Sequence, residues 1–228
     1  LPESLGNLAH LERFDAHNLK HKHVLSGQIP ESIGNLIHLE YFRVHNNALS
    51  GQIPESIGNL THLKIFDVGR NTLSGQLPES IWNLTHLKHF DVYRNGFSGQ
   101  IPDSIGNLIH LELFDVGKNA LSGQIPVSMG NLKSLTYLKL AQNMFTGPVS
   151  MLSSLTSLVN LGLYDNQFTD SLDFLSDLSS SEYITLARND FYGLIPPAVT
   201  ELCARETTRC FFSDNNRLCG DGERGENT

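Results

Sequence analysis

The chain has 228 residues, 39% hydrophobic and 18% charged, so it is long enough for one sizeable core and too ordinary in composition for a disordered tail. Its formal net charge of −8, with only 16 Lys and Arg residues, argues against the broad basic surface that nucleic acids or anionic membranes require. No segment approaches the roughly 20 apolar residues of a membrane-spanning helix, so direct membrane insertion is not expected.

One short repeat dominates the sequence. Its asparagines recur every 24 and then every 23 residues, at Asn47, Asn71, Asn95, Asn119, Asn143, Asn166 and Asn189. A short fixed period predicts a solenoid, in which each unit buries its apolar face only against its neighbours.

Each repeat contains a segment that alternates apolar and polar residues. Around residue 42, Phe42 and Val44 alternate with Tyr41, Arg43 and His45. This period of two predicts a short strand with one buried face, and stacked copies predict a parallel sheet. The inward phenylalanine column is Phe14, Phe42, Phe66, Phe90 and Phe114.

Polar and turn-forming residues follow each strand. The Asn of each repeat is expected to turn its amide inward and to satisfy backbone groups at the bend. Gly51 and its equivalents supply permissive backbone at the next corner, and Pro54 and its equivalents cap the segment that follows. We interpret these columns as structural.

Residues 49–60 read L-S-G-Q-I-P-E-S-I-G-N-L, and close variants recur at 73–84 and 97–108. The phrase resembles the plant-type leucine-rich repeat of receptor-like kinases and related secreted proteins. The resemblance implies an α/β solenoid, a right-handed superhelix with a parallel concave β-sheet. It also implies an extra strand at the S-G-x-I-P segment, short 3-10 or loop segments on the convex side, and ligand binding on the concave or adjoining lateral face.

The resemblance covers residues 1–202, as about eight repeats of 23–24 residues. Residues 203–228 are predicted to form a cysteine-containing C-terminal cap and tail, because residues 213–220 resemble the cap of that family. Cys203, Cys210 and Cys219 predict one local disulfide with one cysteine left over, and the sequence leaves the pairing open.

The chain departs from the family pattern near its start. The family's amino-terminal cysteine cap is absent and Leu1 enters in mid-repeat, so we expect the natural protein to extend further. The first repeat also carries four extra residues within 17–24. This insertion is expected to loop out beside the concave edge, where His21, Lys22 and His23 are candidate ligand contacts.

The outward strand positions are the predicted ligand-binding face, because they mix aromatic, apolar and charged residues as interface anchors do. The alternative is that these side chains merely pack on one another across strands. For the stacked aspartates, an alternative is neutralisation by Arg70, Arg94 and Lys118. The candidate residues are Tyr41, Arg43, Ile65, Asp67, His89, Asp91, Tyr93, Leu113, Asp115, Tyr137 and Lys139.

A histidine column lies just before the inward Leu of five repeats, at His10, His38, His62, His86 and His110. Its protonation below a pKa of about 6.5 would place several like charges in a row and weaken the stack in acid, but the favoured interpretation is an exposed edge that tolerates many polar residues. Metal binding at this column or at His21 and His23 is not favoured, because no carboxylate or Cys completes a ligand set.

Two sequons, at Asn59 and Asn83, occupy the same repeat position and predict N-glycosylation of a secreted chain. No nucleophile is paired with a base, and no cofactor or metal motif stands in a suitable context, so the sequence predicts no enzyme.

The sequence thus predicts a non-catalytic recognition module of a receptor-like or secreted protein. Its expected partners are a protein or peptide ligand and a co-receptor, and its expected location is extracellular or at the cell surface, as a plasma-membrane ectodomain. One alternative is an inhibitor of a secreted hydrolase. Another is a structural solenoid that meets a repetitive surface with the glutamine column Gln28, Gln52, Gln76, Gln100 and Gln124.

Overall fold

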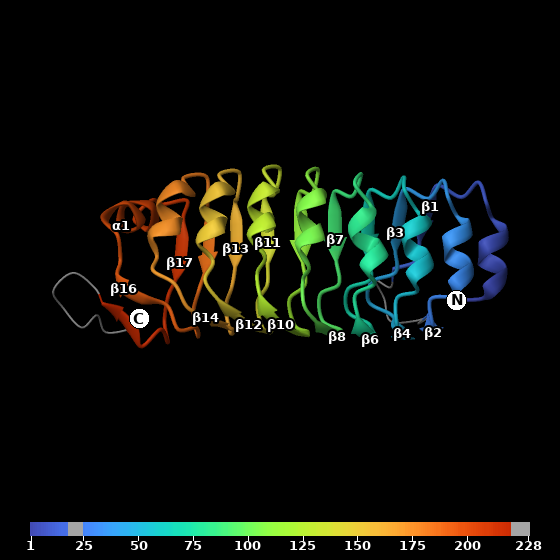
Figure 1. The fold of residues 1–228 in the computed structure, drawn as a ribbon, viewed down its shortest axis with the longest axis horizontal. Helices are drawn as coiled ribbons and strands as arrows, with labels where there is room; N and C mark the ends of the chain where they lie inside the picture. The colour runs from blue at the N-terminus through green and yellow to red at the C-terminus, as the bar shows by residue number, and fades with distance from the viewer. Residues whose placement is uncertain (18–24, 220–228) are drawn as a thin grey trace.

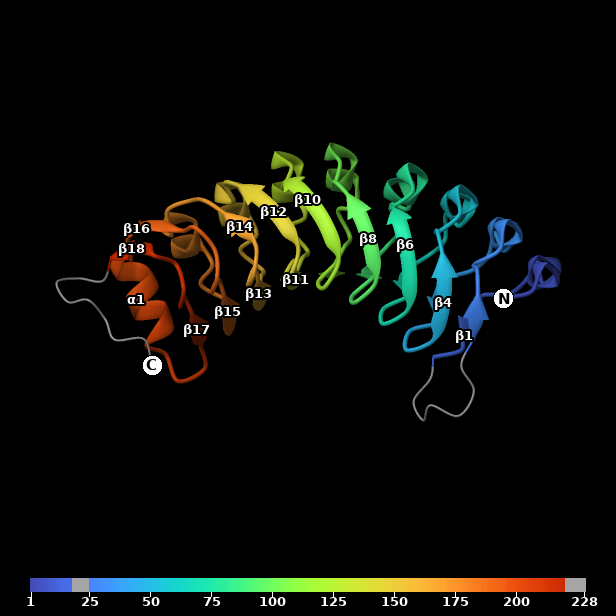
Figure 2. The same ribbon diagram turned by 90° about the horizontal axis from the view of Figure 1, so that it is seen from below.

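The computed structural model describes residues 1–17 and 25–219 of the chain. The repeats stack side by side in chain order (Figure 1), and the stack bends into an arc (Figure 2). This confirms the predicted α/β solenoid. His21, Lys22 and His23 lie outside the described residues.

The first strand of each repeat joins one parallel nine-stranded sheet, whose order follows the chain. This sheet lines the inner side of the arc (Figure 2). Its strands are β1 (Arg13–Asp15), β3 (Tyr41–Arg43), β5 (Ile65–Asp67), β7 (His89–Asp91), β9 (Leu113–Asp115), β11 (Tyr137–Lys139), β13 (Asn160–Gly162), β15 (Tyr183–Thr185) and β17 (Arg209–Phe211).

The extra strand implied by the S-G-Q-I-P phrase is present and forms a second, seven-stranded parallel sheet. Its strands are β2 (Ser26–Gly27), β4 (Ala48–Gly51), β6 (Thr72–Gln76), β8 (Gly96–Gly99), β10 (Ala120–Gln124), β12 (Met144–Gly147) and β14 (Gln167–Phe168). Near the C-terminus, β16 (Tyr192–Leu194) pairs with β18 (Arg217–Cys219) instead.

Five-residue 3-10 helices follow on the outer side of the arc (Figure 2). Six of them begin directly after a proline, whose fixed φ suits the first position of a helix. They are η1 (Glu3–Asn7), η2 (Glu31–Asn35), η3 (Glu55–Asn59), η4 (Glu79–Asn83), η5 (Asp103–Asn107), η6 (Val127–Asn131), η7 (Ser150–Ser154) and η8 (Asp173–Asp177), and one α-helix, α1 (Pro197–Cys203), follows.

The inward phenylalanines form a continuous stack between the layers. The ring centroids of Phe42 and Phe66 are 5.8 Å apart, and those of Phe90 and Phe114 are 5.4 Å apart. All four side chains are fully buried. Trp82, which replaces the glycine of other repeats, packs on Phe90 at 5.7 Å. Each repeat therefore buries its apolar face against its neighbours.

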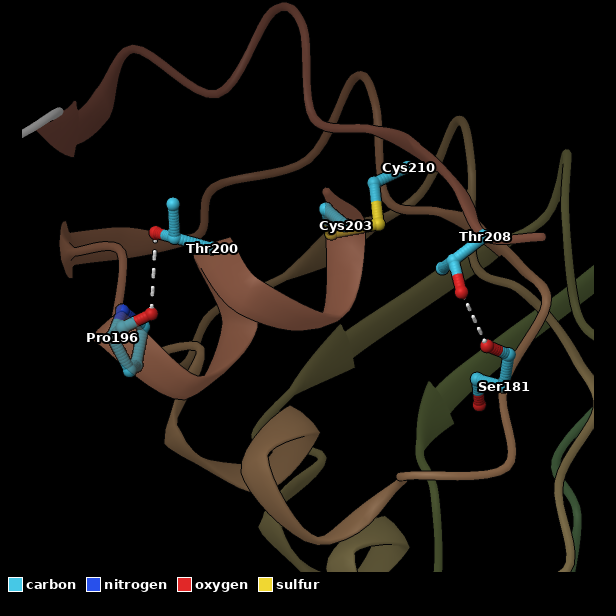
Figure 3. Close-up of a disulfide and its surroundings, with 6 residues drawn as sticks. All are labelled: Ser181, Pro196, Thr200, Cys203, Thr208 and Cys210. Atoms are coloured by element: carbon cyan, nitrogen blue, oxygen red, sulfur yellow. Dashed lines mark hydrogen bonds between the residues drawn. A yellow bond between two sulfur atoms is a disulfide. The ribbon is translucent and has the colours of Figure 1, made fainter. Parts of the chain in front are cut away.

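The C-terminal end is joined to the last strand by a disulfide between Cys203, at the end of α1, and Cys210, in β17 (Figure 3). Nearby, the Thr208 hydroxyl donates to the Ser181 carbonyl at 3.1 Å. Cys219 is exposed and has no disulfide partner among residues 1–17 and 25–219.

Candidate functional site

Five outward side chains form one row on the concave sheet. Strand pairing aligns Tyr41, Ile65, His89, Leu113 and Tyr137 in register. The inward residues between them are fully buried, whereas these five remain partly exposed to solvent, and Tyr137 is 41% exposed. We call these five residues the apolar row, although His89 lies at its centre.

The N-terminal end of the apolar row is covered by cations. The Arg13 guanidinium lies 4.2 Å from the ring centroid of Tyr41, and that of Arg43 lies 5.6 Å from it. These distances are within the range of cation–π contacts. Tyr41 is therefore already held in place on its strand.

The next outward column carries Asp67, Asp91 and Asp115, aligned on β5, β7 and β9. Each carboxylate accepts a hydrogen bond from the backbone N–H two residues further on, at 3.2, 2.8 and 3.1 Å respectively. Short polar side chains commonly satisfy the backbone at such bends. The aspartates therefore close the turn at the end of each strand.

Basic side chains lie beside the two ends of this acidic column, and among the described residues none forms an ion pair with its centre. His45 Nδ1 lies 2.6 Å from the Asp67 carboxylate, and Lys139 Nζ lies 3.4 Å from that of Asp115. Burial, followed by repulsion from Asp115 and Asp67, raises the pKa of Asp91 to about 7. Asp91 is thus the least compensated carboxylate of the column.

The alternative in which Arg70, Arg94 and Lys118 neutralise the aspartates through a ladder of ion pairs is wrong. Within the described ranges, no carboxylate oxygen lies within 4.0 Å of these three cations. The aspartates bind strand-end N–H groups instead. The cations follow on exposed residues with positive φ angles of 54°, 55° and 53°.

Tyr93 lies two residues after Asp91, in the turn that follows β7. The Arg70 guanidinium lies 5.3 Å from its ring centroid and the Lys118 ammonium lies 5.8 Å from it. The tyrosine is thus flanked by cations from the preceding and the following repeats. These contacts were not anticipated, because sequence spacing does not reveal which way a residue after a strand end turns.

The asparagines form a hydrogen-bonded ladder beneath the turns. The Asn95 amide donates to the Val68 and Val92 carbonyls, both at 3.1 Å, and its oxygen accepts from the Leu73 N–H at 3.0 Å. The same pattern recurs at Asn47, Asn71, Asn119, Asn143, Asn166 and Asn189.

Asn215 extends the ladder by one further step, donating to the Leu186 and Phe212 carbonyls. Sequence reasoning missed this residue, because its spacing from Asn189 is longer than that of the other repeats.

The histidine column lies on one exposed edge. His38 has its ring centroid 5.9 Å from that of His10 and 6.1 Å from that of His62. Nδ1 of His62 lies 3.0 Å from the Ile37 carbonyl of the preceding repeat. A second pair, His17 and His45, stacks at 4.6 Å on the concave side, and the repeat pattern did not single it out.

Both sequon asparagines, Asn59 and Asn83, are exposed at the ends of η3 and η4. Among residues 1–17 and 25–219, no group of three His, Cys, Asp or Glu side chains is placed to hold a metal ion. In the same ranges, no helix has the length and apolar character needed to cross a bilayer.

The family signature described as Leucine Rich Repeat matches residues 38–60, 62–84 and 86–108. No match was found among curated protein sequences.

Three solved structures illustrate the likeness. The Arabidopsis receptor kinase HAESA was solved in complex with the peptide hormone IDA and the co-receptor SERK1. Its sequence is 27% identical to this chain and the TM-score is 0.79. The match covers 99% of this chain and 41% of the HAESA chain. A TDR receptor is 30% identical with a TM-score of 0.76, and the match covers 96% of this chain and 41% of the receptor chain. A plant ice-binding protein is 26% identical with a TM-score of 0.72, and the match covers 96% of this chain and 76% of the ice-binding protein.

The chain thus spans less than half the length of the receptors. By its repeat signature and its fold, the chain is a solenoid of leucine-rich repeats, and it is similar to plant receptor ectodomains of that kind.

Proposed function

We propose that the chain is a non-catalytic module that recognises a peptide or protein outside the cell, as part of a receptor-like or secreted protein. The observation that carries this proposal is the apolar row. It crosses five adjacent strands, with His89 at its centre, and leaves aromatic and aliphatic side chains at least partly exposed on the sheet. Such side chains are typical anchors of binding interfaces.

The dimensions of the apolar row suit an extended peptide. Parallel strands are about 4.8 Å apart, so five strands span about 19 Å, which is the length of roughly six extended residues. In the neighbouring column, Asp67 and Asp91 remain partly exposed beside this path, whereas Asp115 is buried. A ligand with basic or hydroxyl-bearing side chains next to apolar anchors fits this pair of columns.

The comparisons support this choice of ligand. HAESA was solved with a peptide hormone and a co-receptor, and PEPR1, 28% identical over 96% of this chain with a TM-score of 0.75, was solved with AtPEP1. The exposed sequons at Asn59 and Asn83 suit a glycosylated, extracellular chain, and they lie at the ends of outer helices, away from the concave sheet. A co-receptor is a further partner within this proposal.

The test is selection of binding peptides from a random display library against the oxidised protein. Affinities of the selected peptides are then compared for wild type and the Tyr41→Ala, Ile65→Ala, Leu113→Ala variant. Loss of these anchors should weaken binding at least about tenfold, since one anchor side chain contributes about 1–2 kcal/mol.

The matched control is the Ile37→Ala, Ile109→Ala, Val127→Ala variant, which removes side chains that are 50%, 52% and 76% exposed away from the concave sheet. If both variants lose affinity for the peptides equally, or if neither loses any, the concave face is not the binding site. Circular dichroism and thermal unfolding establish that both variants remain folded.

A second candidate function, binding to a repetitive surface such as ice, rests on the glutamine column. The side chain of each glutamine lies against a glycine of the next repeat, so that a β-carbon on Gly75 would be 2.9 Å from Gln52 Cγ. The same relation holds for Gln28 with Gly51 and for Gln124 with Gly147. The result is a regular row of amides beside the second sheet, and one similar structure is a plant ice-binding protein.

This candidate is tested by thermal hysteresis and by inhibition of ice recrystallisation. Charged Gln52→Glu and Gln100→Glu substitutions should abolish any such activity, because they disturb the regular row without removing its packing. The apolar-row variant serves as the control and should retain full activity. Absence of activity in the wild-type protein would eliminate this candidate.

A further inference from the structure

Two histidines at equivalent positions of adjacent repeats stack on the concave side. His17 follows β1 and His45 follows β3, and their ring centroids are 4.6 Å apart with 15° between the ring planes. The two side chains are 28% and 25% exposed, so solvent reaches both rings. The next repeat has Gly69 at this position, so the stack ends after two rings. We call His17 and His45 the histidine pair.

A carboxylate lies beside the Nδ1 atom of each ring. His17 Nδ1 contacts the Asp15 carboxylate, and His45 Nδ1 lies 2.6 Å from the Asp67 carboxylate. The second contact lacks the alignment of a full hydrogen bond, and Nδ1 of His45 is buried. In the described part of the chain, no hydrogen bond engages Nε2 of either ring. Nε2 is therefore the nitrogen that each ring offers to a ligand.

Both Nε2 atoms lie on the same side of the stack. Asp15 and Asp67 belong to one outward column of the concave sheet, in which strand pairing aligns them through Arg43. Because each Nδ1 atom faces this column, the two rings stack with like edges together. The two Nε2 atoms then share the opposite edge, where one ion can contact both.

We propose that the histidine pair binds a divalent transition-metal ion such as Zn²⁺ through its two Nε2 atoms. Imidazole is a preferred ligand of such ions, and a metal-binding histidine commonly has a carboxylate beside its other ring nitrogen. The Arg43 guanidinium lies 3.6 Å from the Asp15 carboxylate. With Asp67 it leaves one net negative charge beside the pair, which favours a cation.

The separation of the two rings suits one shared ion. With Zn–N bonds of about 2.0–2.1 Å, two nitrogens of a tetrahedral site are about 3.4 Å apart. From a ring separation of 4.6 Å, a tilt that moves each Nε2 by about 0.6 Å reaches this distance. The histidine column on the other edge is less suitable. Its centroids are 5.9 and 6.1 Å apart, and Nδ1 of His62 faces a backbone carbonyl.

The ion would keep coordination positions open. Among residues 1–17 and 25–219, no third His, Cys, Asp or Glu side chain is placed to complete the ligand set, so water fills the remaining positions. The ion would tie the first repeat to the second at the N-terminal end of the concave face. This site goes beyond the proposed peptide recognition, because neither histidine belongs to the apolar row.

The test is calorimetric titration of Zn²⁺ into the oxidised protein at pH 7.5, with excess Mg²⁺, which prefers oxygen ligands. The wild type should bind Zn²⁺, and His17→Gln or His45→Gln should weaken binding at least about tenfold. Asp15→Asn should weaken it about tenfold, because losing the carboxylate beside a metal-binding histidine costs about 10–100-fold in affinity. Affinity should also fall towards pH 5.5, since protons compete for imidazole.

The matched control is His10→Gln, His38→Gln, which removes a stacked pair whose rings are 5.9 Å apart. It should bind Zn²⁺ within about twofold of wild type. Every protein in the series carries Cys219→Ser, because the exposed thiol is a competing ligand. Circular dichroism establishes that the variants remain folded.

Three results overturn the proposal. The first is no binding of Zn²⁺ by wild type at about 1 mM, and the second is equal weakening in the control and in the His17 and His45 variants. The third is full affinity in both of these variants together with a loss in His21→Gln, His23→Gln, which would assign the ion to the insertion. Peptide binding by the apolar row is measured separately and does not depend on any of these outcomes.

Discussion

Asp91 and Asp115 occupy paired positions on β7 and β9, so two carboxylates lie next to each other on the concave sheet. Lys139 compensates Asp115 at 3.4 Å, whereas Asp91 has the Tyr93 N–H at 2.8 Å as its hydrogen-bond donor. The repulsion remaining in this column makes the stability of the repeat stack dependent on pH.

The pKa of Asp91 is raised from 3.8 to about 7, so between these values the folded state binds more protons than the unfolded state. The contribution of this group to the free energy of unfolding is therefore present at low pH and is lost as the pH rises towards 7. Asp91→Asn should stabilise the protein at pH 8, by on the order of 2–4 kcal/mol, and have little effect at pH 4. Urea unfolding at the two pH values measures this. The exposed carboxylate of Asp103, changed to Asn, is the control. An unchanged pH profile in the Asp91 variant would mean that Asp91 is ionised at neutral pH.

Asn95→Ala should destabilise the stack by about 1–3 kcal/mol. It leaves the Leu73 N–H without its side-chain acceptor, whereas the Val68 and Val92 carbonyls keep Asn71 and Asn119 as donors. Asn107→Ala, at the exposed end of η5, should change stability by less than about 0.5 kcal/mol. Chemical denaturation compares the two, and similar destabilisation by both would show that the ladder is not a source of stability.

The sequence predicts the register of the solenoid well, because a strict period brings equivalent residues together whatever their detailed contacts. The phenylalanine stack and the outward row of Tyr41, Ile65 and Leu113 both follow from it. The repeat period does not predict the partners of Asp67, Asp91 and Asp115, and the reason is physical. Each carboxylate binds a backbone N–H, and Asp67 and Asp115 also meet His45 and Lys139 instead of the cation three residues on. Which basic side chain is within reach depends on the direction of the backbone after the strand, and spacing does not encode that direction.

The side-chain contacts of the candidate site are less predictable than the fold. The outward columns follow from the period, but the cations around Tyr93 and the protonation of Asp91 depend on side-chain conformation and burial. The insertion around His21 has no counterpart in other repeats, so the period carries no information on its contacts.

Gly75→Ala should cost more than Gly193→Ala, although both glycines have positive φ, 86° and 87°. A β-carbon at Gly75 would lie 2.9 Å from Gln52 Cγ, whereas nothing lies within 4 Å of one at Gly193. Both variants carry a backbone penalty of about 1 kcal/mol, and the first must also displace Gln52. Thermal unfolding measures the difference. Combining Gly75→Ala with Gln52→Ala should remove the additional cost, and failure to do so would place the strain in the backbone alone.

Breaking the Cys203–Cys210 disulfide should loosen only the C-terminal end of the solenoid. The bond closes a short loop between α1 and β17, with a sequence separation of 7, and its removal should cost about 2–3 kcal/mol in the loop-entropy description. Repeats contact only their neighbours, so the effect should decay within about one or two repeats. In a Cys203→Ser, Cys210→Ser variant, amide hydrogen exchange should accelerate in β17 and β15 and stay unchanged in β3 to β9. Uniform acceleration along the chain would show instead that the stack unfolds as one cooperative unit, and the stability of each concave strand would then depend on the C-terminal end.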